Sequence, residues 1–128
     1  MGYDDRVEFK NLLDKTLVSI KGKVGDEELI FICSDGSKYK MHHYQDCCEC
    51  VSLEDICGDL QDLIGAPILK AEESTSETNP VGVTPEYQDS FTWTFYRIAT
   101  RKGLVVLRWY GESNGYYSES VDFELMNS

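Results

Sequence analysis

Two strand-like runs, residues 28–33 and 38–42, flank the sequence Ser34-Asp35-Gly36-Ser37. Asp-Gly between two such runs is the strongest short-range signal of a β-hairpin, because both residues tolerate the left-handed backbone of a tight turn. A third strand-like run at 17–21 precedes them, separated by a turn at 25–27. The sequence therefore predicts three successive antiparallel strands, and this hairpin constrains the fold more than any other feature.

Residues 53–64 carry the spacing of an amphipathic helix. Their apolar positions are Leu53, Ile56, Cys57, Leu60, Leu63 and Ile64. The preceding Ser52-Leu53-Glu54-Asp55 matches the signature of a helix start, with Ser52 as the cap. Gly65 and Pro67 follow, which is typical of a helix end. We expect a helix over 53–64 and a second, short helix within residues 4–14, where acidic residues come early.

The remaining runs complete a sheet. Residues 68–73, 91–99, 104–110 and 121–125 have strand character, and the polar stretch 74–89 is expected to be a mobile loop. A chain of 128 residues has the usual size of one domain. The sequence thus predicts a single α+β domain over 1–128, with an antiparallel β-sheet of about six to seven strands, one helix packed on a face and a short N-terminal helix.

The charge narrows the class of partner. The chain has 23 acidic and 12 basic residues, a formal charge of −11, which repels nucleic acid and suits a partner with a basic surface. No apolar run approaches the roughly 20 residues that span a bilayer, so we expect a cytoplasmic protein without membrane association. In a reducing compartment the five cysteines should be thiols, and Cys33, inside a strand-like run, should be buried.

The segment 42–50, His42-His43-Tyr44-Gln45-Asp46-Cys47-Cys48-Glu49-Cys50, gathers strong metal-ligand and acid/base side chains. Structural zinc sites use separated ligand pairs such as Cys-x-x-Cys, a spacing that this segment does not have. A nucleophilic Cys47 or Cys48 would lie near the expected helix start, but Asp46 and Glu49 disfavour a thiolate. Strand alternation also directs His42 and His43 to opposite faces. We predict no metal ligand and no catalytic residue here.

A second polar stretch, 108–118, combines amphipathic aromatics with amide, hydroxyl and guanidinium groups, which are enriched at binding surfaces. We expect it to converge in space with 43–49. The predicted binding residues are His43, Gln45, Asp46, Cys47, Cys48, Glu49, Arg108, Trp109, Glu112, Ser113, Asn114, Tyr116 and Tyr117. A buried sheet face with tyrosines at its rim is the structural alternative for the second stretch.

Long motifs carry a family resemblance. They are His43-Tyr44-Gln45-Asp46-Cys47-Cys48-Glu49, the segments 54–60 and 62–68, Trp93-Thr94-Phe95-Tyr96, and Arg108-Trp109-Tyr110-Gly111-Glu112-Ser113-Asn114-Gly115-Tyr116-Tyr117-Ser118. In these motifs the chain resembles a small uncharacterised domain family common in bacteriophage genomes, over roughly residues 16–124. The resemblance implies a phage or prophage accessory protein and carries no known activity.

Three functional hypotheses follow. The leading one is a non-enzymatic protein without cofactor that binds a host protein and inhibits a host defence system. In the second, Arg108, Trp109, Asn114, Tyr116 and Tyr117 hold a nucleotide signal by stacking and hydrogen bonds, which would sequester it. The third is a cysteine or metal site at His43, Asp46, Cys47, Cys48 and Glu49. The sequence leaves both a monomer and a homodimer open.

Overall fold

The computed structural model describes residues 6–43, 49–77, 90–113 and 119–126. In chain order the elements are η2 (Phe9–Leu12), β1 (Leu17–Lys21), β2 (Glu28–Cys33), β3 (Lys38–His42), β4 (Cys50–Cys57), η3 (Leu60–Leu63), β5 (Lys70–Ser76), β6 (Ser90–Thr100), β7 (Gly103–Ser113) and β8 (Asp122–Met126). The η elements are single turns of 3-10 helix. No helix in these four ranges has the length and apolar character that crossing a membrane requires.

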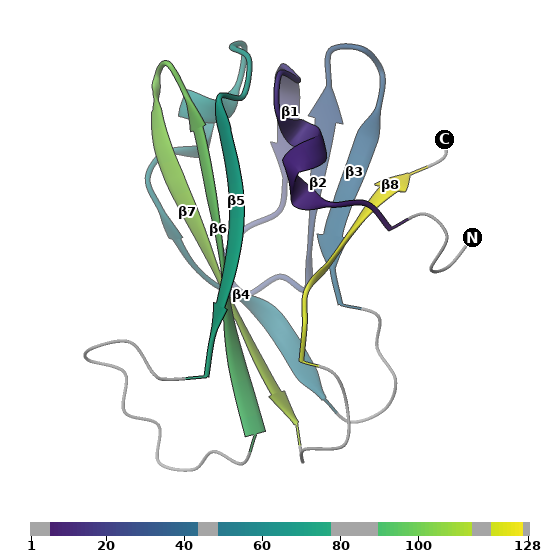
Figure 1. Ribbon diagram of the computed structural model, residues 1–128, viewed down its shortest axis with the longest axis vertical. Coiled ribbons are helices and arrows are strands. Elements are labelled where there is room, and N and C mark those ends of the chain that lie inside the picture. Colours follow the sequence, from purple (N-terminus) through teal and green to yellow (C-terminus); the bar gives the residue numbers. More distant parts are fainter. Residues whose placement is uncertain (1–5, 44–48, 78–89, 114–118, 127–128) are drawn as a thin grey trace.

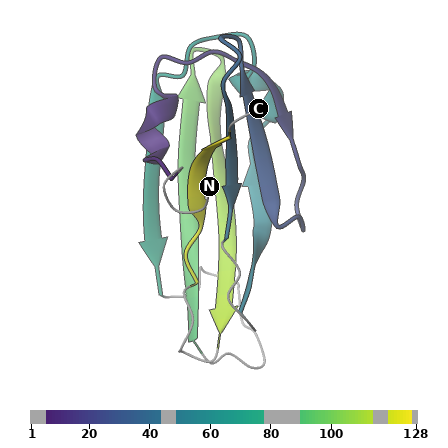
Figure 2. The ribbon, with the colours of Figure 1, turned by 90° about the vertical axis from the view of Figure 1, so that its right-hand side faces the viewer.

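The strands form two antiparallel sheets of four strands each, in the orders β1-β2-β3-β8 and β4-β7-β6-β5. The sheets face each other across the core (Figure 1), and their strands run roughly along the long axis of the molecule (Figure 2). The protein is therefore a β-sandwich. The expected α+β architecture, with a helix packed on one sheet, is wrong.

The hairpin predicted around Asp35-Gly36 is confirmed. Strands β1, β2 and β3 pair antiparallel in succession, and Gly36 adopts a φ of +91° in the turn. The Asp35 carboxylate accepts hydrogen bonds from the Lys15 ammonium at 2.7 Å and from the Ser37 amide at 2.9 Å. These donors hold the pKa of Asp35 well below its usual range. The Asp35 side chain therefore stabilises the turn.

The segment expected to be the helix 53–64 is strand β4 followed by η3. Val51 and Leu53 point into the core in strand alternation, and a β-bulge between Leu53 and Asp55 then adds one residue. Because of the bulge, the next inward residue is Ile56, opposite the buried Leu107. Inward residues three apart across a bulge reproduce helical spacing, which explains the wrong prediction.

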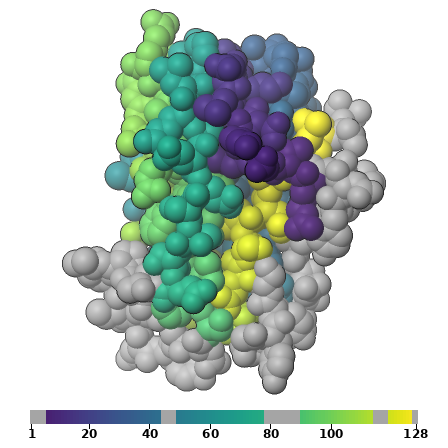
Figure 3. Space-filling view, viewed as in Figure 1, coloured from purple at the N-terminus to yellow at the C-terminus, as the bar shows by residue number. Residues whose placement is uncertain are grey.

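The expected N-terminal helix over 4–14 is reduced to the single turn η2, within the described residues of that segment. This N-terminal segment crosses from one sheet to the other between β5 and β8 (Figure 3). The Val7 amide donates to the Phe123 carbonyl at 2.9 Å, and the Phe9 ring lies 4.6 Å from Tyr96 and 5.3 Å from Phe123. Aromatic packing therefore closes this seam of the sandwich.

Inward-facing side chains of both sheets form one core, which includes Leu29, Phe31 and Met41 from the first sheet and Ile98, Leu107 and Trp109 from the second. The Trp109 indole Nε1–H donates to the Met41 Sδ at 3.1 Å and so links the two layers. Cys33 is 2% exposed, which confirms its predicted burial, and burial raises the pKa of its thiol. The described cysteines Cys33, Cys50 and Cys57 are free thiols.

Tyr96 should give the protein a measurable alkaline sensitivity. Its hydroxyl is buried and donates to Glu73 Oε2 at 2.8 Å, and burial together with the nearby carboxylate raises its pKa far above the usual range. Above pH 10 or so, the unfolded chain loses this proton first, so the free energy of unfolding should fall by up to about 1.4 kcal/mol per pH unit from this group. In the Tyr96→Phe variant, the free energy of unfolding should lack this contribution and therefore fall less steeply with pH.

Urea unfolding of both proteins between pH 8 and pH 11 or so measures this difference. Below pH 9 or so the two pH profiles should run parallel, because the phenol is protonated in both the folded and the unfolded state. Equal slopes above pH 10 or so would show that Tyr96 ionises as readily in the folded protein as in the unfolded chain.

Candidate functional site

Several strand ends meet at one end of the sandwich. In the second sheet Cys50 opposes Glu112 and Ser90 opposes Ser113, so the start of β4, the end of β7 and the start of β6 lie together. In the first sheet His42, at the end of β3, opposes the first residue of β8. These ends lie toward the bottom of Figure 1. We call the region formed by His43, Glu49, Ser113 and Glu119 the His43 end.

A buried histidine–carboxylate pair occupies the His43 end. His43 Nε2 lies 2.7 Å from Glu49 Oε2, and the two side chains are 3% and 0% exposed. His43 Nδ1 lies 2.6 Å from the Ser120 carbonyl oxygen, which can only accept, so Nδ1 carries a hydrogen. The short contact between His43 Nε2 and Glu49 Oε2 therefore contains one further proton. The pair is either an imidazolium with a carboxylate or a neutral imidazole with a carboxylic acid. Both ring nitrogens are engaged, which suits a structural role.

A second carboxylate lies beside this pair. Glu119 is 9% exposed and accepts hydrogen bonds from Thr92 Oγ1 at 2.9 Å and from Ser113 Oγ at 2.6 Å. A Cβ atom on Gly111 would lie 2.4 Å from the Glu119 carbonyl oxygen. Only glycine lets β7 approach residue 119 this closely. The network therefore joins β6, β7 and the residues that lead into β8.

The described parts of the two predicted binding stretches do meet. Glu119 bonds to Ser113 of the second stretch, and its neighbour Ser120 bonds to His43 of the first. Of the thirteen predicted residues, His43, Glu49, Arg108, Trp109, Glu112 and Ser113 are described. The others, Gln45, Asp46, Cys47, Cys48, Asn114, Tyr116 and Tyr117, lie outside the described residues.

Strand β7 divides the predicted residues between its two faces. Trp109 and Ser113 face the core, whereas Arg108 and Glu112 face outward. Trp109 is fully buried and bonded to Met41, so it belongs to the core and offers no binding surface in this structure. The Arg108 guanidinium lies 5.0 Å above the Trp93 ring, and Glu112 accepts from the Tyr110 hydroxyl at 3.1 Å. Trp93 is only 2% exposed beneath these neighbours, so the partly exposed Arg108, Tyr110 and Glu112 form the outer surface of β7.

The two histidines point to opposite faces, as strand alternation predicted. His42 lies on the outer face of the first sheet, with Nε2 2.7 Å from Glu124 Oε1. His43 is turned inward to Glu49. The two rings therefore do not converge on one metal ion. Within the described ranges, no group of three or more His, Cys, Asp or Glu side chains has metal-binding geometry.

Sequence reasoning missed three residues of the site, namely Thr92, Glu119 and Ser120. Their partners are 27, 6 and 77 positions away along the chain, so contacts made by folding create most of this network. Trp93 was also missed as an outward residue of β6. The alternation of threonine and aromatic residues around Trp93 was the available signal, because it assigns one of the two sets to the outer face.

Residues 10–123 match the family described as "Domain of unknown function (DUF7448)", and the chain belongs to that family. The match starts within η2 and ends at the second residue of β8, so it includes strands β1 to β7 in full. No curated protein and no solved structure matches the chain.

Proposed function

We propose that this DUF7448 protein is a non-enzymatic binding protein that holds a host protein on the surface around the His43 end. Its biology would be that of a phage or prophage accessory factor which inhibits a host defence system. The phage origin rests on the sequence resemblance alone. The binding role rests on one structural observation, the convergence of both predicted binding stretches at one end of a rigid sandwich.

This convergence supports binding because strand ends on a rigid scaffold are where sandwich proteins commonly carry recognition residues. His43, Glu49 and Glu119 are buried and hydrogen-bonded, so they fix where the connecting segments leave the sheets. Because the strand ends are held in place, less conformational entropy is lost when a binding surface on them becomes ordered. The buried network is thus the support of the surface and does not itself contact the partner.

Charge supports a basic partner. The chain carries a formal charge of −11, and Glu112 lies on the outer face of β7 beside the His43 end. Charges of opposite sign across an interface increase the association rate and exclude wrong partners. We therefore expect the complex to weaken as salt concentration rises.

The nucleotide-sequestering hypothesis named five residues that would hold the ligand by stacking and hydrogen bonds. One of them, Trp109, has its indole fully buried between the sheets, where it donates to Met41 Sδ. Arg108 faces the other side of the strand, over Trp93. A site that needs both side chains on one ligand is therefore not proposed.

Charge reversal at Glu112 tests the proposal. Tagged protein is purified under reducing conditions from the bacterial cell that carries its gene, and co-purified proteins are identified and quantified by mass spectrometry. We expect the substitution Glu112→Lys to lower recovery of the specific partner about tenfold, which corresponds to about 1.4 kcal/mol of binding free energy.

The matched control is Glu72→Lys, which makes the same charge change at a strand position whose side chain is 59% exposed and pairs only loosely with Lys70, at 3.6 Å. This variant should retain the partner. Equal loss with both substitutions would show that only net charge matters, and retention by both would place the interface away from the His43 end. Either result would refute the proposal.

A further inference from the structure

Arg108 lies on the outer face of the second sheet, between Asp55 of β4 and Phe95 of β6, which oppose it in the two ladders. Its guanidinium lies 5.0 Å above the Trp93 ring, and Tyr110 also covers that ring, at 4.6 Å between centroids. Trp93 is only 2% exposed and so forms a fixed base. A planar guanidinium stacked on such a ring is held in one orientation.

The Arg108 guanidinium makes no hydrogen bond to any residue that the structure describes. Its Nε is buried without a partner, and the Asp55 carboxylate comes only within 4.0 Å of Nη2, beyond hydrogen-bond distance. The side chain is 26% exposed. A guanidinium carries five N–H donors, and protein donors that are largely removed from water normally have partners. The donors at the two Nη atoms are therefore available to a group from another molecule.

Two other arginines show the difference. Arg6 Nη1 lies 3.0 Å from Asp122 Oδ1, and Arg97, on the same outer face as Arg108, donates to Ser74 Oγ at 3.1 Å. The chain contains 23 acidic residues, so carboxylates are plentiful. The fold nevertheless gives Arg108 an aromatic base in place of a close carboxylate.

The position of Arg108 links it to the proposed binding surface. Glu112 lies four residues further along the same face of β7, roughly 13 Å away at about 3.3 Å per residue, with Tyr110 between them. A host protein that was basic throughout would place its cations against Arg108 when it covered Glu112. Like charges that face each other in an interface cost binding free energy. A partner that covers both residues must therefore offer an acceptor opposite Arg108.

We infer that Arg108 anchors the interface by pairing with a carboxylate of the host protein, an aspartate or glutamate side chain set within a basic surface. This inference rests on the proposed function and adds the chemistry of the partner. Two carboxylate oxygens match two N–H donors of one guanidinium. Because Trp93 already orients the Arg108 side chain, little side-chain entropy is lost on pairing. Arginine, tryptophan and tyrosine are also the residue types that most often carry binding energy.

The inference predicts a change in affinity of opposite sign from the one that charge alone predicts. Removal of a cation makes the protein more acidic, so a uniformly basic partner should bind equally well or more tightly. A partner that uses a carboxylate at Arg108 should bind more weakly to the Arg108→Gln variant, because that carboxylate would be left unpaired in the interface.

Purification of tagged protein with its co-purified partner, as for Glu112→Lys, measures this sign. Arg108→Gln should lower recovery of the specific partner at least about tenfold. Arg108→Lys keeps the charge but loses the paired donors and the planar stack, so its recovery should be intermediate. Arg97→Gln is the matched control. It removes the same charge from the same face, at a position opposite Val106 and further from the His43 end, and should retain the partner.

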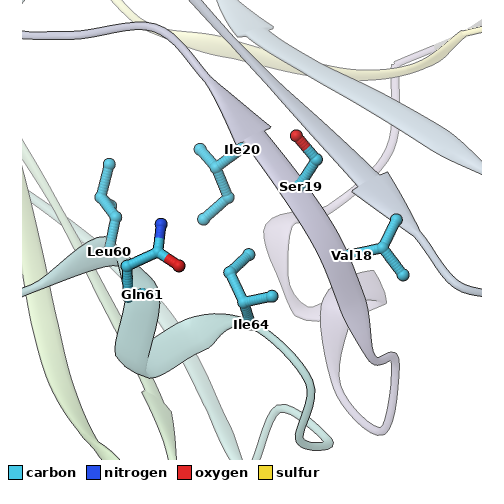
Figure 4. Close-up of a pocket in the computed structure, with 6 residues that line it drawn as sticks. All are labelled: Val18, Ser19, Ile20, Leu60, Gln61 and Ile64. Carbon is cyan, nitrogen blue, oxygen red and sulfur yellow. The ribbon is translucent and has the colours of Figure 1, made fainter.

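A second control lies toward the opposite end of the sandwich, where a recess of about 150 Å³ opens between β1 and η3. Figure 4 shows the residues that line it, Val18, Ser19, Ile20, Leu60, Gln61 and Ile64. Leu17, next to Val18, pairs with Cys33 at the end of β2, whereas His43 follows the far end of β3. Val18 is 53% exposed, so Val18→Glu lowers the net charge by one, as Arg108→Gln does, without loss of a buried side chain. This variant should also retain the partner.

Thermal unfolding confirms that each variant is folded before recoveries are compared. Unchanged or increased recovery with Arg108→Gln would overturn the inference. Equal losses with Arg108→Gln, Arg97→Gln and Val18→Glu would overturn it too, because the effect would not be specific to Arg108. If Glu112→Lys still loses the partner in these cases and Glu72→Lys retains it, the proposed function stands without the inference. A protein from which no specific partner is recovered would refute both.

Discussion

Replacing His43 with leucine should lower the free energy of unfolding by about 3–5 kcal/mol, because it leaves a buried carboxylate without its imidazole partner. The His43 and Glu49 side chains are 3% and 0% exposed and 2.7 Å apart, so water cannot take the place of the lost group. The substitution also removes the hydrogen bond from Nδ1 to the Ser120 carbonyl. Urea denaturation at neutral pH, analysed as a two-state transition, measures the loss.

The matched control is His42→Leu, the neighbouring histidine on the outer face. Its partner Glu124 is 12% exposed and keeps a second cation, the Lys40 ammonium, at 3.7 Å. We therefore expect a clearly smaller loss for this variant. The double variant His43→Leu/Glu49→Leu should recover much of the stability that His43→Leu loses, since it removes both buried polar groups together. Similar losses for His42→Leu and His43→Leu, or no recovery in the double variant, would contradict the buried-pair interpretation.

The strands were predictable where local signals agreed. Around Asp35-Gly36, turn residues and strand periodicity lead to the same hairpin, and β2 and β3 have the predicted bounds, 28–33 and 38–42. In β3 the alternation of Tyr39 and Met41 with lysines assigned each side chain to the correct face. Such signals operate within a few residues, so one sequence suffices to detect them.

The fold class was not predictable from the same signals. The residue pattern that indicated a helix at β4 lies within one segment, whereas the pairing that makes this segment a strand involves β7, which is distant in the sequence. Leu53 and Ile56 are three apart, as on a helix, and Ser52 with Asp55 imitates a capping pair. In the structure, pairing with β7 across a bulge produces the same spacing. No periodicity within the segment separates these two cases. Without the helix, the remaining strands must cover each other, which gives a sandwich instead of a sheet with a helix on one face.

The candidate site was predictable only in part. His43 and Glu49 were chosen for their chemistry, and the structure brings them together. Trp109 was predicted to be a binding residue, whereas the structure places it in the core, and the alternation of Val105, Leu107 and Trp109 along β7 already assigns it to one face with aliphatic residues. Amphipathic aromatics are common both at binding surfaces and at the margins of cores, so residue type alone does not distinguish these roles.

Truncation of Trp109 to alanine should lower the free energy of unfolding by about 3–5 kcal/mol, the second large effect that we expect. The side chain is fully buried in the core cluster, and its loss leaves a cavity between the two sheets and removes the hydrogen bond to Met41 Sδ. Because a domain of this size is usually stable by only about 5–15 kcal/mol, the variant should be near the limit of folding. Thermal unfolding followed by near-ultraviolet circular dichroism measures the loss.

Trp93→Ala is the matched control, since it removes the same side chain from the outer face of the same sheet. Trp93 is itself only 2% exposed, covered by Tyr110 at 4.6 Å between ring centroids and by Arg108, but it lies outside the core cluster between the sheets. Rearrangement of these neighbours can fill the space, so the loss should be smaller than for Trp109→Ala. The milder Trp109→Phe keeps an aromatic core and should retain any protein partner. Loss of the partner by Trp109→Phe at unchanged stability would instead show that Trp109 contacts it directly, as the sequence had suggested.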